Sequence, residues 1–275
     1  MMSRSHFTLQ VIIGVLTVLF VLTANIASVS GWSNGGYSSG PANPKYGTHD
    51  WIANHALDWL PQSTKQFILD NLNTYLYGTE LPDNGAAADG VGDQTKHHVY
   101  YFANGLLQED DSAVRAQQEY DNAVNFFRAG DMVNAAKRLG MMTQYISDLA
   151  SFGHVMGSKT DWGKADRHSQ YEDYVNSRTN NYNGAFNSFL NFDGDWKNIS
   201  AYDAALALAR DTTFSGGRGL TCVWMESNYG WSNSVFVNRC GESLNLAVNL
   251  IADVLHAFYV KEAGPEIPIS TIVMV

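Results

Sequence analysis

The chain has 275 residues, of which 45% are hydrophobic and 16% charged, and its formal net charge at pH 7 is −10. This length and apolar content suffice for one sizeable core, and no internal repeat or polar linker divides the chain, so a single domain is expected. The acidic balance disfavours stable nucleic-acid binding, which normally relies on a basic surface, although bound metal ions could supply positive charge locally.

Residues 1–31 have the composition of a secretory signal peptide: Arg4 near the start, an apolar run from Val11, and small residues just before Trp32. Cleavage would remove Arg4 and leave 16 basic and 27 acidic side chains, with a net charge of −11. We therefore expect a secreted or cell-surface protein. The alternative is an uncleaved N-terminal membrane anchor, since the run from Val11 to Val29 is long enough to span a bilayer.

Helical periodicity recurs along the rest of the chain, and no segment alternates for long enough to predict a strand. The sequence predicts helices in these ranges: 50–60, 64–78, two helices within 112–154 that are separated at Ala129 and Gly130, 201–210, and 242–264. The last of them ends at Gly264 and Pro265. We expect an all-α, compact multi-helix domain over residues 32–263, followed by a C-terminal tail, 264–275, that is too short to cross a membrane.

Three connections are longer than a compact helical domain needs: residues 33–48, 80–96 and 157–167. Each of them directly precedes a histidine, namely His49, His97 and His168. Loops of this length usually carry function or are disordered. The sequence therefore points to the loops as the place to search for a site.

The two cysteines, Cys222 and Cys240, are expected to form a disulfide if the chain is exported to an oxidising compartment. Closing that loop would be worth about 3 kcal/mol in the chain-entropy model. The segment between the cysteines is rich in Asn, Ser, Gly and Trp, which predicts little helix and a need for such a crosslink. The alternative is two free thiols.

A histidine and carboxylate constellation lies in the centre of the chain. On a helix that begins near Arg167, His168 and Glu172 are four residues apart and project from one face. Imidazole nitrogen and carboxylate oxygen suit zinc, and His154 is the candidate third ligand. Asp148 precedes His154 by six residues, so the two side chains would point in different directions along a straight helix, and two metals could share the segment.

The segment "QYISDLASFGHVMGSKTDWGKADRHSQYE" resembles the zinc-dependent phospholipase C family, which includes secreted bacterial phosphatidylcholine-hydrolysing enzymes and the catalytic domain of clostridial alpha-toxin. Asp148, His154, His168 and Glu172 match the spacings of the family pattern. The resemblance implies an all-α fold of the type shared with single-strand-specific zinc nucleases, with long loops around a cluster of up to three zinc ions. It covers most of the chain from Trp32 to Glu172.

Two matches near the N-terminus extend the resemblance. The family begins its mature chain with a tryptophan whose α-amine and carbonyl oxygen bind zinc, and this implies that Trp32 is a ligand after signal-peptide cleavage. The family's Thr-His pair implies the same function for His49, which follows Thr48. The gap between Trp32 and His49 is somewhat longer than in the family.

A third match lies in "YGTELPDNGAAADGVGDQTKHHVYYF", which resembles the family's Pro-Asp followed by a histidine before aromatic residues. It implies that Asp83 is the catalytic aspartate, with Asp93 as the weaker alternative. It also implies a zinc ligand at His97 or His98, and the sequence does not choose between the two.

The chain departs from the family at Gln144, where the pattern has a zinc-binding histidine four residues before Asp148. Glutamine offers only a neutral amide oxygen, which is a poor zinc ligand. The ion that Gln144 would share with Asp148 and the His97–His98 pair is therefore expected to be weak, different, or bound with help from the second histidine.

The resemblance implies a secreted zinc-dependent phosphodiesterase, a phospholipase C that hydrolyses the glycerol-side phosphodiester bond with a metal-activated water. Its partners would be a phospholipid or another phosphodiester and, transiently, a membrane surface, and the protein is expected to act as a monomer. One alternative is a single-strand-specific zinc nuclease of the related fold. Another is a metal-binding surface protein whose catalysis is impaired by Gln144.

Overall fold

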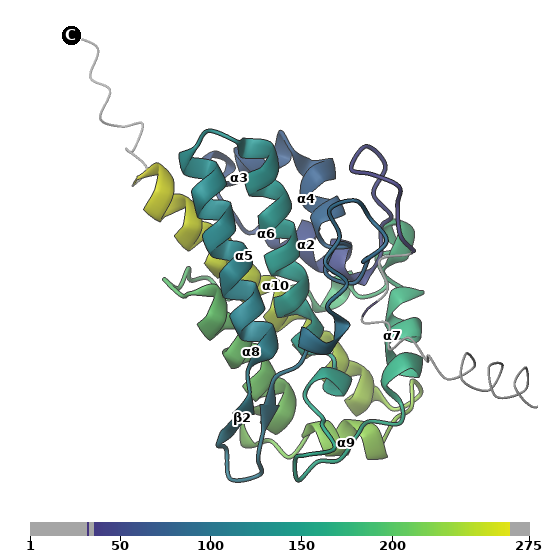
Figure 1. The fold of residues 1–275 in the computed structure, drawn as a ribbon. Helices are drawn as coiled ribbons and strands as arrows, with labels where there is room; N and C mark the ends of the chain where they lie inside the picture. The colour runs from purple at the N-terminus through teal and green to yellow at the C-terminus, as the bar shows by residue number, and fades with distance from the viewer. Residues whose placement is uncertain (1–31, 33–35, 265–275) are drawn as a thin grey trace, which may run out of the picture. The chain divides into compact units, whose positions relative to one another are not determined.

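The computed structural model describes Trp32 and residues 36–264, and it confirms an all-α architecture (Figure 1). The expected signal peptide and most of the expected tail lie outside the described residues. The helices are α2 (Thr48–Asp58), α3 (Gln62–Leu69), α4 (Leu72–Gly78), α5 (Asp111–Arg128), α6 (Met132–Ser147), α7 (His168–Asn176), α8 (Ala201–Phe214), α9 (Cys222–Ser227) and α10 (Ser234–Ala263). Single 3-10 turns occupy Gln94–Lys96, Asp148–Ala150, Phe152–His154, Asn180–Tyr182, Asn187–Phe189 and Ser215–Gly217.

The structure differs from the sequence prediction in several local features. The predicted helix 64–78 is two helices, α3 and α4, because the backbone leaves the helical conformation at Asn71. The short helix α9 was not predicted. A small antiparallel hairpin pairs β1 (Tyr100–Tyr101) with β2 (Leu107–Glu109), and its strands are too short to show alternation in the sequence.

Four helices begin at a side chain that accepts hydrogen bonds from the first turn. These caps are Asp131 before α6, Ser200 before α8, Thr221 before α9 and Asn233 before α10. Between α5 and α6 the chain turns at Gly130, whose φ of +77° favours glycine. The predicted break at Ala129 and Gly130 is thus confirmed.

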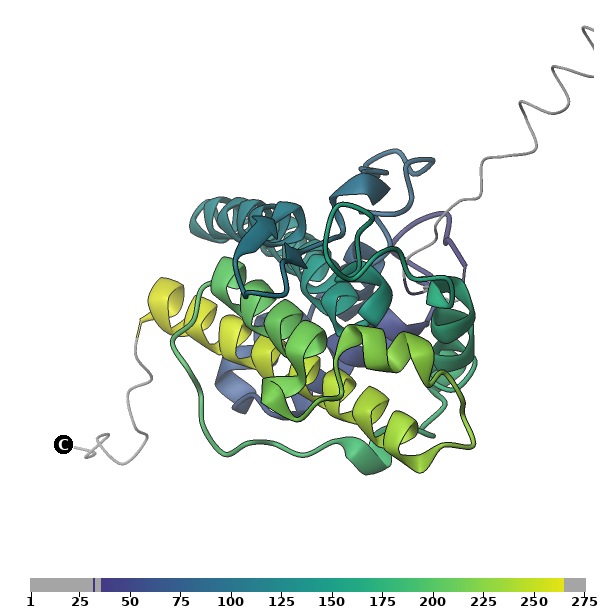
Figure 2. The ribbon, with the colours of Figure 1, turned by 90° about the horizontal axis from the view of Figure 1, so that it is seen from below.

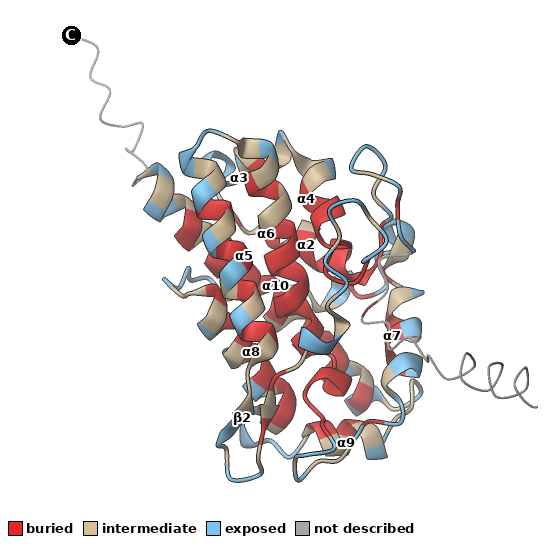
Figure 3. Cartoon of the chain, in the orientation of Figure 1, coloured by how far each residue is buried: buried red, intermediate tan, exposed pale blue. Residues whose placement is uncertain are grey.

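Helix α10 lies in the core of the described structure. It crosses behind α5 and α6, which lie side by side (Figure 1), and the view from below shows it next to α8 (Figure 2). By length and composition α10 could cross a membrane, but 67% of its most apolar window is buried inside the protein. That burial, visible along the inner faces in Figure 3, is typical of the core helix of a globular domain.

Two glycines let α4 and α6 approach closely. A Cβ added at Gly140 would lie 2.0 Å from the carbonyl oxygen of Tyr75 and 3.0 Å from Cα of Gly78. A Cβ at Gly78 would lie 2.2 Å from the carbonyl oxygen of Lys137. These neighbours are backbone atoms, so α4 cannot accommodate a side chain here without moving. The contact matters for the site because α6 carries Gln144 and ends at Ser147, directly before Asp148.

The predicted disulfide is wrong, because Cys222 and Cys240 are both free and buried. The segment between them does not need a crosslink: it forms α9 and the first turns of α10, each with its own side-chain cap at Thr221 and Asn233. Both thiols lie within the hydrophobic core. Burial raises the pKa of each thiol to about 12.

The substitution Gly140→Ala should destabilise the fold by about 1–3 kcal/mol, the range found for overpacked cores. Alanine normally stabilises a helix relative to glycine by up to about 1 kcal/mol, so the sign of the effect reports on the contact with α4. Urea unfolding followed by circular dichroism measures it. The control is Gly40→Ala, where a Cβ meets nothing within 4 Å, and equal stability of the two variants would contradict the close approach.

Iodoacetamide at pH 8 should leave both cysteines of the folded protein unmodified, because the reactive thiolate is scarce when the pKa is near 12. In denaturant without reductant, mass spectrometry should find both cysteines alkylated. Prior reduction should not change this result. If the denatured chain were alkylated only after reduction, the two cysteines would be linked by a disulfide, and the sequence prediction would be correct.

Candidate metal centre

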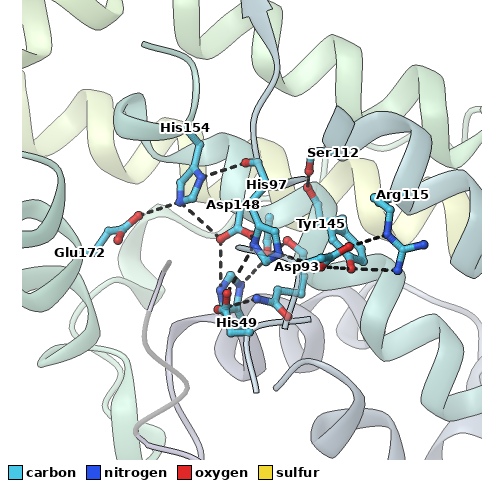
Figure 4. Close-up of polar contacts among 12 residues, drawn as sticks. His49, Asp93, His97, Ser112, Arg115, Tyr145, Asp148, His154 and Glu172 are labelled. Atoms are coloured by element: carbon cyan, nitrogen blue, oxygen red, sulfur yellow. Dashed lines mark hydrogen bonds and ion pairs between the residues drawn. The ribbon is translucent and has the colours of Figure 1, made fainter. Parts of the chain in front are cut away.

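Segments far apart in the sequence bring ionisable side chains to one buried place (Figure 4). The first turn of α2 carries His49, and His97 lies between a 3-10 turn and β1. At the end of α6 the backbone continues as two 3-10 turns, Asp148–Ala150 and Phe152–His154. The change of helix type lets Asp148 and His154 face the same cluster, whereas a straight helix would have turned them apart. Helix α7 begins at His168 and carries Glu172 one turn later.

Asp148 lies at the centre of this cluster and is fully buried. Its Oδ2 is 2.8 Å from His97 Nδ1, and its Oδ1 is 3.3 Å from His49 Nε2 and 3.6 Å from His154 Nε2. Burial alone would raise the pKa of Asp148. The charges and hydrogen bonds of the surrounding imidazoles outweigh burial and hold that pKa well below its usual range, so the carboxylate is ionised.

His154, His168 and Glu172 form the best-defined ligand set. Glu172 Oε1 is 3.1 Å from His154 Nε2 and 2.7 Å from His168 Nε2, and the ligand atoms of the three residues all lie within 4.8 Å of one another. His154 Nδ1 is 2.8 Å from the carbonyl oxygen of His97. A hydrogen bond donated there leaves Nε2 with its lone pair directed at the cluster, which is how metal-binding histidines are usually oriented.

The pKa of Glu172 also indicates an ionised ligand. Burial raises the pKa of this carboxyl, but His168 and His154 outweigh burial and lower it to about 2. Glu172 is thus available as an anionic oxygen donor at neutral pH.

The backbone at Gly153 makes room for the ring of His168. A Cβ at this position would lie 2.1–2.7 Å from three ring atoms of His168. The imidazole is also held by Glu172, so it has little freedom to move aside. Gly153 therefore positions the exposed edge of the ligand set.

The structure distinguishes the adjacent histidines. His97 is the one that faces Asp148, whereas the ring of His98 lies 5.0 Å from that of His154 and 5.4 Å from that of Tyr100. Burial, together with the neighbouring imidazoles, lowers the pKa of His98 to about 3. His98 is therefore a neutral side chain that lines the site beside the ligands.

Asp83 and Asp93 have different surroundings. Asp83 is buried in the cluster, with Oδ1 3.5 Å from His97 Nδ1, and its Oδ2 accepts a hydrogen bond of 2.6 Å from Gln144 Nε2. Burial is the main cause that raises the pKa of Asp83 to about 6; His97 lowers it and Asp148 raises it. Asp93 faces the other side of His97, 3.4 Å from Nε2.

Sequence reasoning did not find the support behind Asp93. Its carboxylate accepts hydrogen bonds of 2.8 Å from Arg115 Nε and 2.7 Å from the Tyr145 hydroxyl. Burial raises the pKa of Asp93, but hydrogen bonds from His97 and Tyr145, with the charge of Arg115, outweigh it and lower that pKa. Arg115 is on α5, and no motif or spacing in the sequence linked it to the cluster.

Trp32 is fully buried, and its ring makes an edge contact at 5.4 Å with Tyr171, the neighbour of Glu172 in α7. The beginning of the described chain thus packs against the helix that carries two candidate ligands. The other histidines of the described chain lie elsewhere: His55 pairs with Asp58 at 2.7 Å, and His256 stacks on Trp196.

Buried polar atoms that make no hydrogen bond of regular geometry gather in this cluster, although several of them lie 3.3–3.6 Å from a histidine nitrogen or a carboxylate oxygen. They are His49 Nε2, Asp83 Oδ1, His97 Nε2, Gln144 Oε1, Asp148 Oδ1 and Glu172 Oε2. Buried polar groups are normally satisfied, and a set of nitrogen and carboxylate oxygen atoms in one place indicates a cation. The residues present therefore fit zinc, with the His154–His168–Glu172 set as the clearest position.

Comparison with known proteins agrees with the helical architecture. No protein-family model and no curated protein matches the chain. Among solved structures it is similar to the alpha-toxin of Clostridium absonum, with a TM-score of 0.55 and 16% sequence identity over 80% of this chain and 66% of the toxin. The chain has the alpha-toxin fold.

A second similar structure is the Clostridium perfringens alpha-toxin isolated from an avian strain. The TM-score is 0.52 and the identity 12%, over 84% of this chain and again 66% of the toxin. The chain thus spans about two thirds of the length of each alpha-toxin. At these identities the likeness establishes the fold, and the chemistry has to be argued from the side chains above.

The substitution Gly153→Ala should weaken zinc binding roughly 10- to 100-fold, the range typical when the support of a metal ligand is disturbed. The new methyl group would displace the His168 ring, while the three ligand side chains remain in the sequence. Competition of the purified protein with a fluorescent zinc chelator measures the affinity. Gly230→Ala is the matched control, since a Cβ there meets no atom closer than 3.8 Å. Equal zinc affinity in both variants would show that His168 is not held as described.

Proposed function

We propose that the chain is a zinc-dependent phosphodiesterase, and specifically a phospholipase C. One observation carries the proposal: a buried ligand set of His154, His168 and Glu172 adjoins Asp148 and the carboxyl group of Asp83, inside an alpha-toxin fold. Proteins use such neighbouring nitrogen and oxygen ligands for hydrolytic zinc centres.

The side chains of the cluster have two proposed roles: most are metal ligands, and one is the general base. His154, His168 and Glu172 would hold one ion, and Asp148 would hold a second with His49 and Trp32. Bound zinc would supply Lewis acidity and positive charge at the phosphate. Among the candidate metal ligands, the side chain of His168 is the most exposed, at 12%, so the substrate phosphate would approach from the α7 side.

Asp83 would act as the general base. Its Oδ2 is held by Gln144, while Oδ1 lacks a hydrogen-bond partner and can accept a proton. The pKa of about 6 is close to the range in which a carboxylate accepts a proton efficiently near neutral pH, and bound cations would lower it. Asp83 would take a proton from the attacking water as the water oxygen forms its bond to phosphorus. The bond between phosphorus and the glycerol oxygen would break, and the leaving oxygen would take up a proton from solvent. The products would be diacylglycerol and a phosphorylated head group.

A phospholipid is the favoured substrate class. The net charge of −10 would repel the many phosphates of a polynucleotide, whereas a lipid surface presents one phosphodiester at a time. The same residues could also serve a single-strand-specific nuclease, which is one rival proposal. A catalytically impaired metal-binding protein is the other rival, and Gln144 is the residue that favours it.

The purified chain should hydrolyse bis(p-nitrophenyl) phosphate and phosphatidylcholine vesicles, and chelation should abolish both activities until zinc is restored. Asp83→Asn should lower kcat by roughly 10²–10⁴, the usual contribution of a general base, with zinc content unchanged. His55→Ala is the control, because His55 lies outside the cluster.

Three results would contradict the proposal. Activity that survives chelation would remove the metal mechanism. Faster hydrolysis of a single-stranded oligonucleotide than of the lipid would favour the nuclease, and zinc binding without hydrolysis of any of the three substrates would favour the impaired protein.

A further inference from the structure

Gln144 presents its amide nitrogen, rather than its oxygen, to the carboxylate of Asp83. It lies one helical turn before Asp148 on α6, so both side chains project to the same side. Both Gln144 and Asp148 are fully buried. The 2.6 Å hydrogen bond from Gln144 Nε2 to Asp83 Oδ2 is among the shortest in the cluster.

An ion between Gln144 and His97 would have a poor ligand set. The amide NH₂ of Gln144 can only donate, and a cation cannot share the position toward which those hydrogens point. The amide oxygen is neutral and would replace the nitrogen donors that zinc prefers. Asp83 Oδ2 is already occupied by Gln144.

The distances between the other ligand atoms also argue against an ion between Gln144 and His97. Among the His, Cys, Asp and Glu residues of residues 36–264, the group of three whose ligand atoms lie within 4.8 Å of one another is His154, His168 and Glu172. His97 Nδ1 lies 3.5 Å from Asp83 Oδ1 and 2.8 Å from Asp148 Oδ2, but these three residues do not form such a group.

The balance between the carboxylate charges and the charges of the ions also favours two ions over three. Asp83, Asp148 and Glu172 supply three negative charges to the cluster, while Asp93 is paired with Arg115 at 2.8 Å. Two divalent ions would leave one surplus positive charge, which matches a phosphodiester monoanion. A third ion would leave an excess of three in a site of low dielectric, where uncompensated charge is costly.

We infer that the cluster holds two zinc ions and that Gln144 is a positioning residue, whose amide fixes Asp83 where a third ion would otherwise bind. This inference rests on the proposed metal centre. The first ion belongs to His154, His168 and Glu172, and the second to Asp148 with His49 and Trp32. Gln144 acts through Asp83 and contacts neither ion.

Zinc content after equilibrium dialysis, measured by inductively coupled plasma mass spectrometry, tests the count. The purified chain, with its N-terminus determined by mass spectrometry, should bind two zinc ions. Gln144→His should bind three, because an imidazole restores the nitrogen donor beside His97 and Asp148. His154→Gln should bind one. Three ions in the unsubstituted chain, or two in Gln144→His, would overturn the inference.

Gln144→Met tests the positioning role, because methionine has a similar shape and no amide. It should retain two zinc ions and a cooperative unfolding transition whose midpoint is lowered by several degrees, because Asp83 Oδ2 loses its partner, while kcat on bis(p-nitrophenyl) phosphate falls roughly 10-fold and KM changes less than about twofold. These magnitudes correspond to the loss of one hydrogen bond to a charged group. An unchanged kcat with two ions bound would overturn the positioning role.

The metal count does not depend on turnover, so the two proposals fail separately. A chain that binds two zinc ions, gains a third in Gln144→His and hydrolyses no phosphodiester would retain this inference and lose the proposed function. A phospholipase C that binds three zinc ions would do the reverse.

Discussion

The structure depends on one buried carboxylate, Asp148, and on the imidazoles that surround it. Removing an ionised carboxylate from water costs on the order of several kcal/mol, which only close, well-placed partners can offset. Here the partners come from α2, from the segment before β1 and from the turn after α6, at 2.8–3.6 Å. Each segment is thereby tied to the end of α6. The polar cluster is part of the fold as well as the candidate site.

The surrounding packing is what holds that cluster rigid. Gly140 lets α4 lie directly against α6, which fixes the helix that delivers Asp148, and Gly153 lets the His168 ring rest on the backbone beside His154. On the far side, Arg115 and Tyr145 hold Asp93 against His97. Ligands supported in this way keep their orientation, and preorganisation of this kind is what a hydrolytic centre requires.

The sequence allowed the all-α fold and the positions of the main helices to be predicted because their apolar spacing is local. The same holds for His168 and Glu172, whose four-residue spacing needs only a helix. Other features depend on tertiary contacts that no spacing reveals. Arg115 reaches Asp93 from another helix. The adjacent His97 and His98 are distinguished only by the direction in which each side chain points. The disulfide prediction was wrong because capped helices, which the composition did not suggest, occupy the segment between Cys222 and Cys240.

Position 144 shows how such a centre can change without loss of its fold. An apolar residue there would leave Asp83 Oδ2 buried and unpaired, at a cost of about 1–3 kcal/mol. Glutamine avoids that cost, since its NH₂ group satisfies the carboxylate at 2.6 Å. The remaining orphan, Gln144 Oε1, is a neutral acceptor and is less costly to bury than a charge. Because the other cluster residues come from separate segments, Gln144→His would leave the scaffold intact. The substitution would change the electrostatics around Asp83.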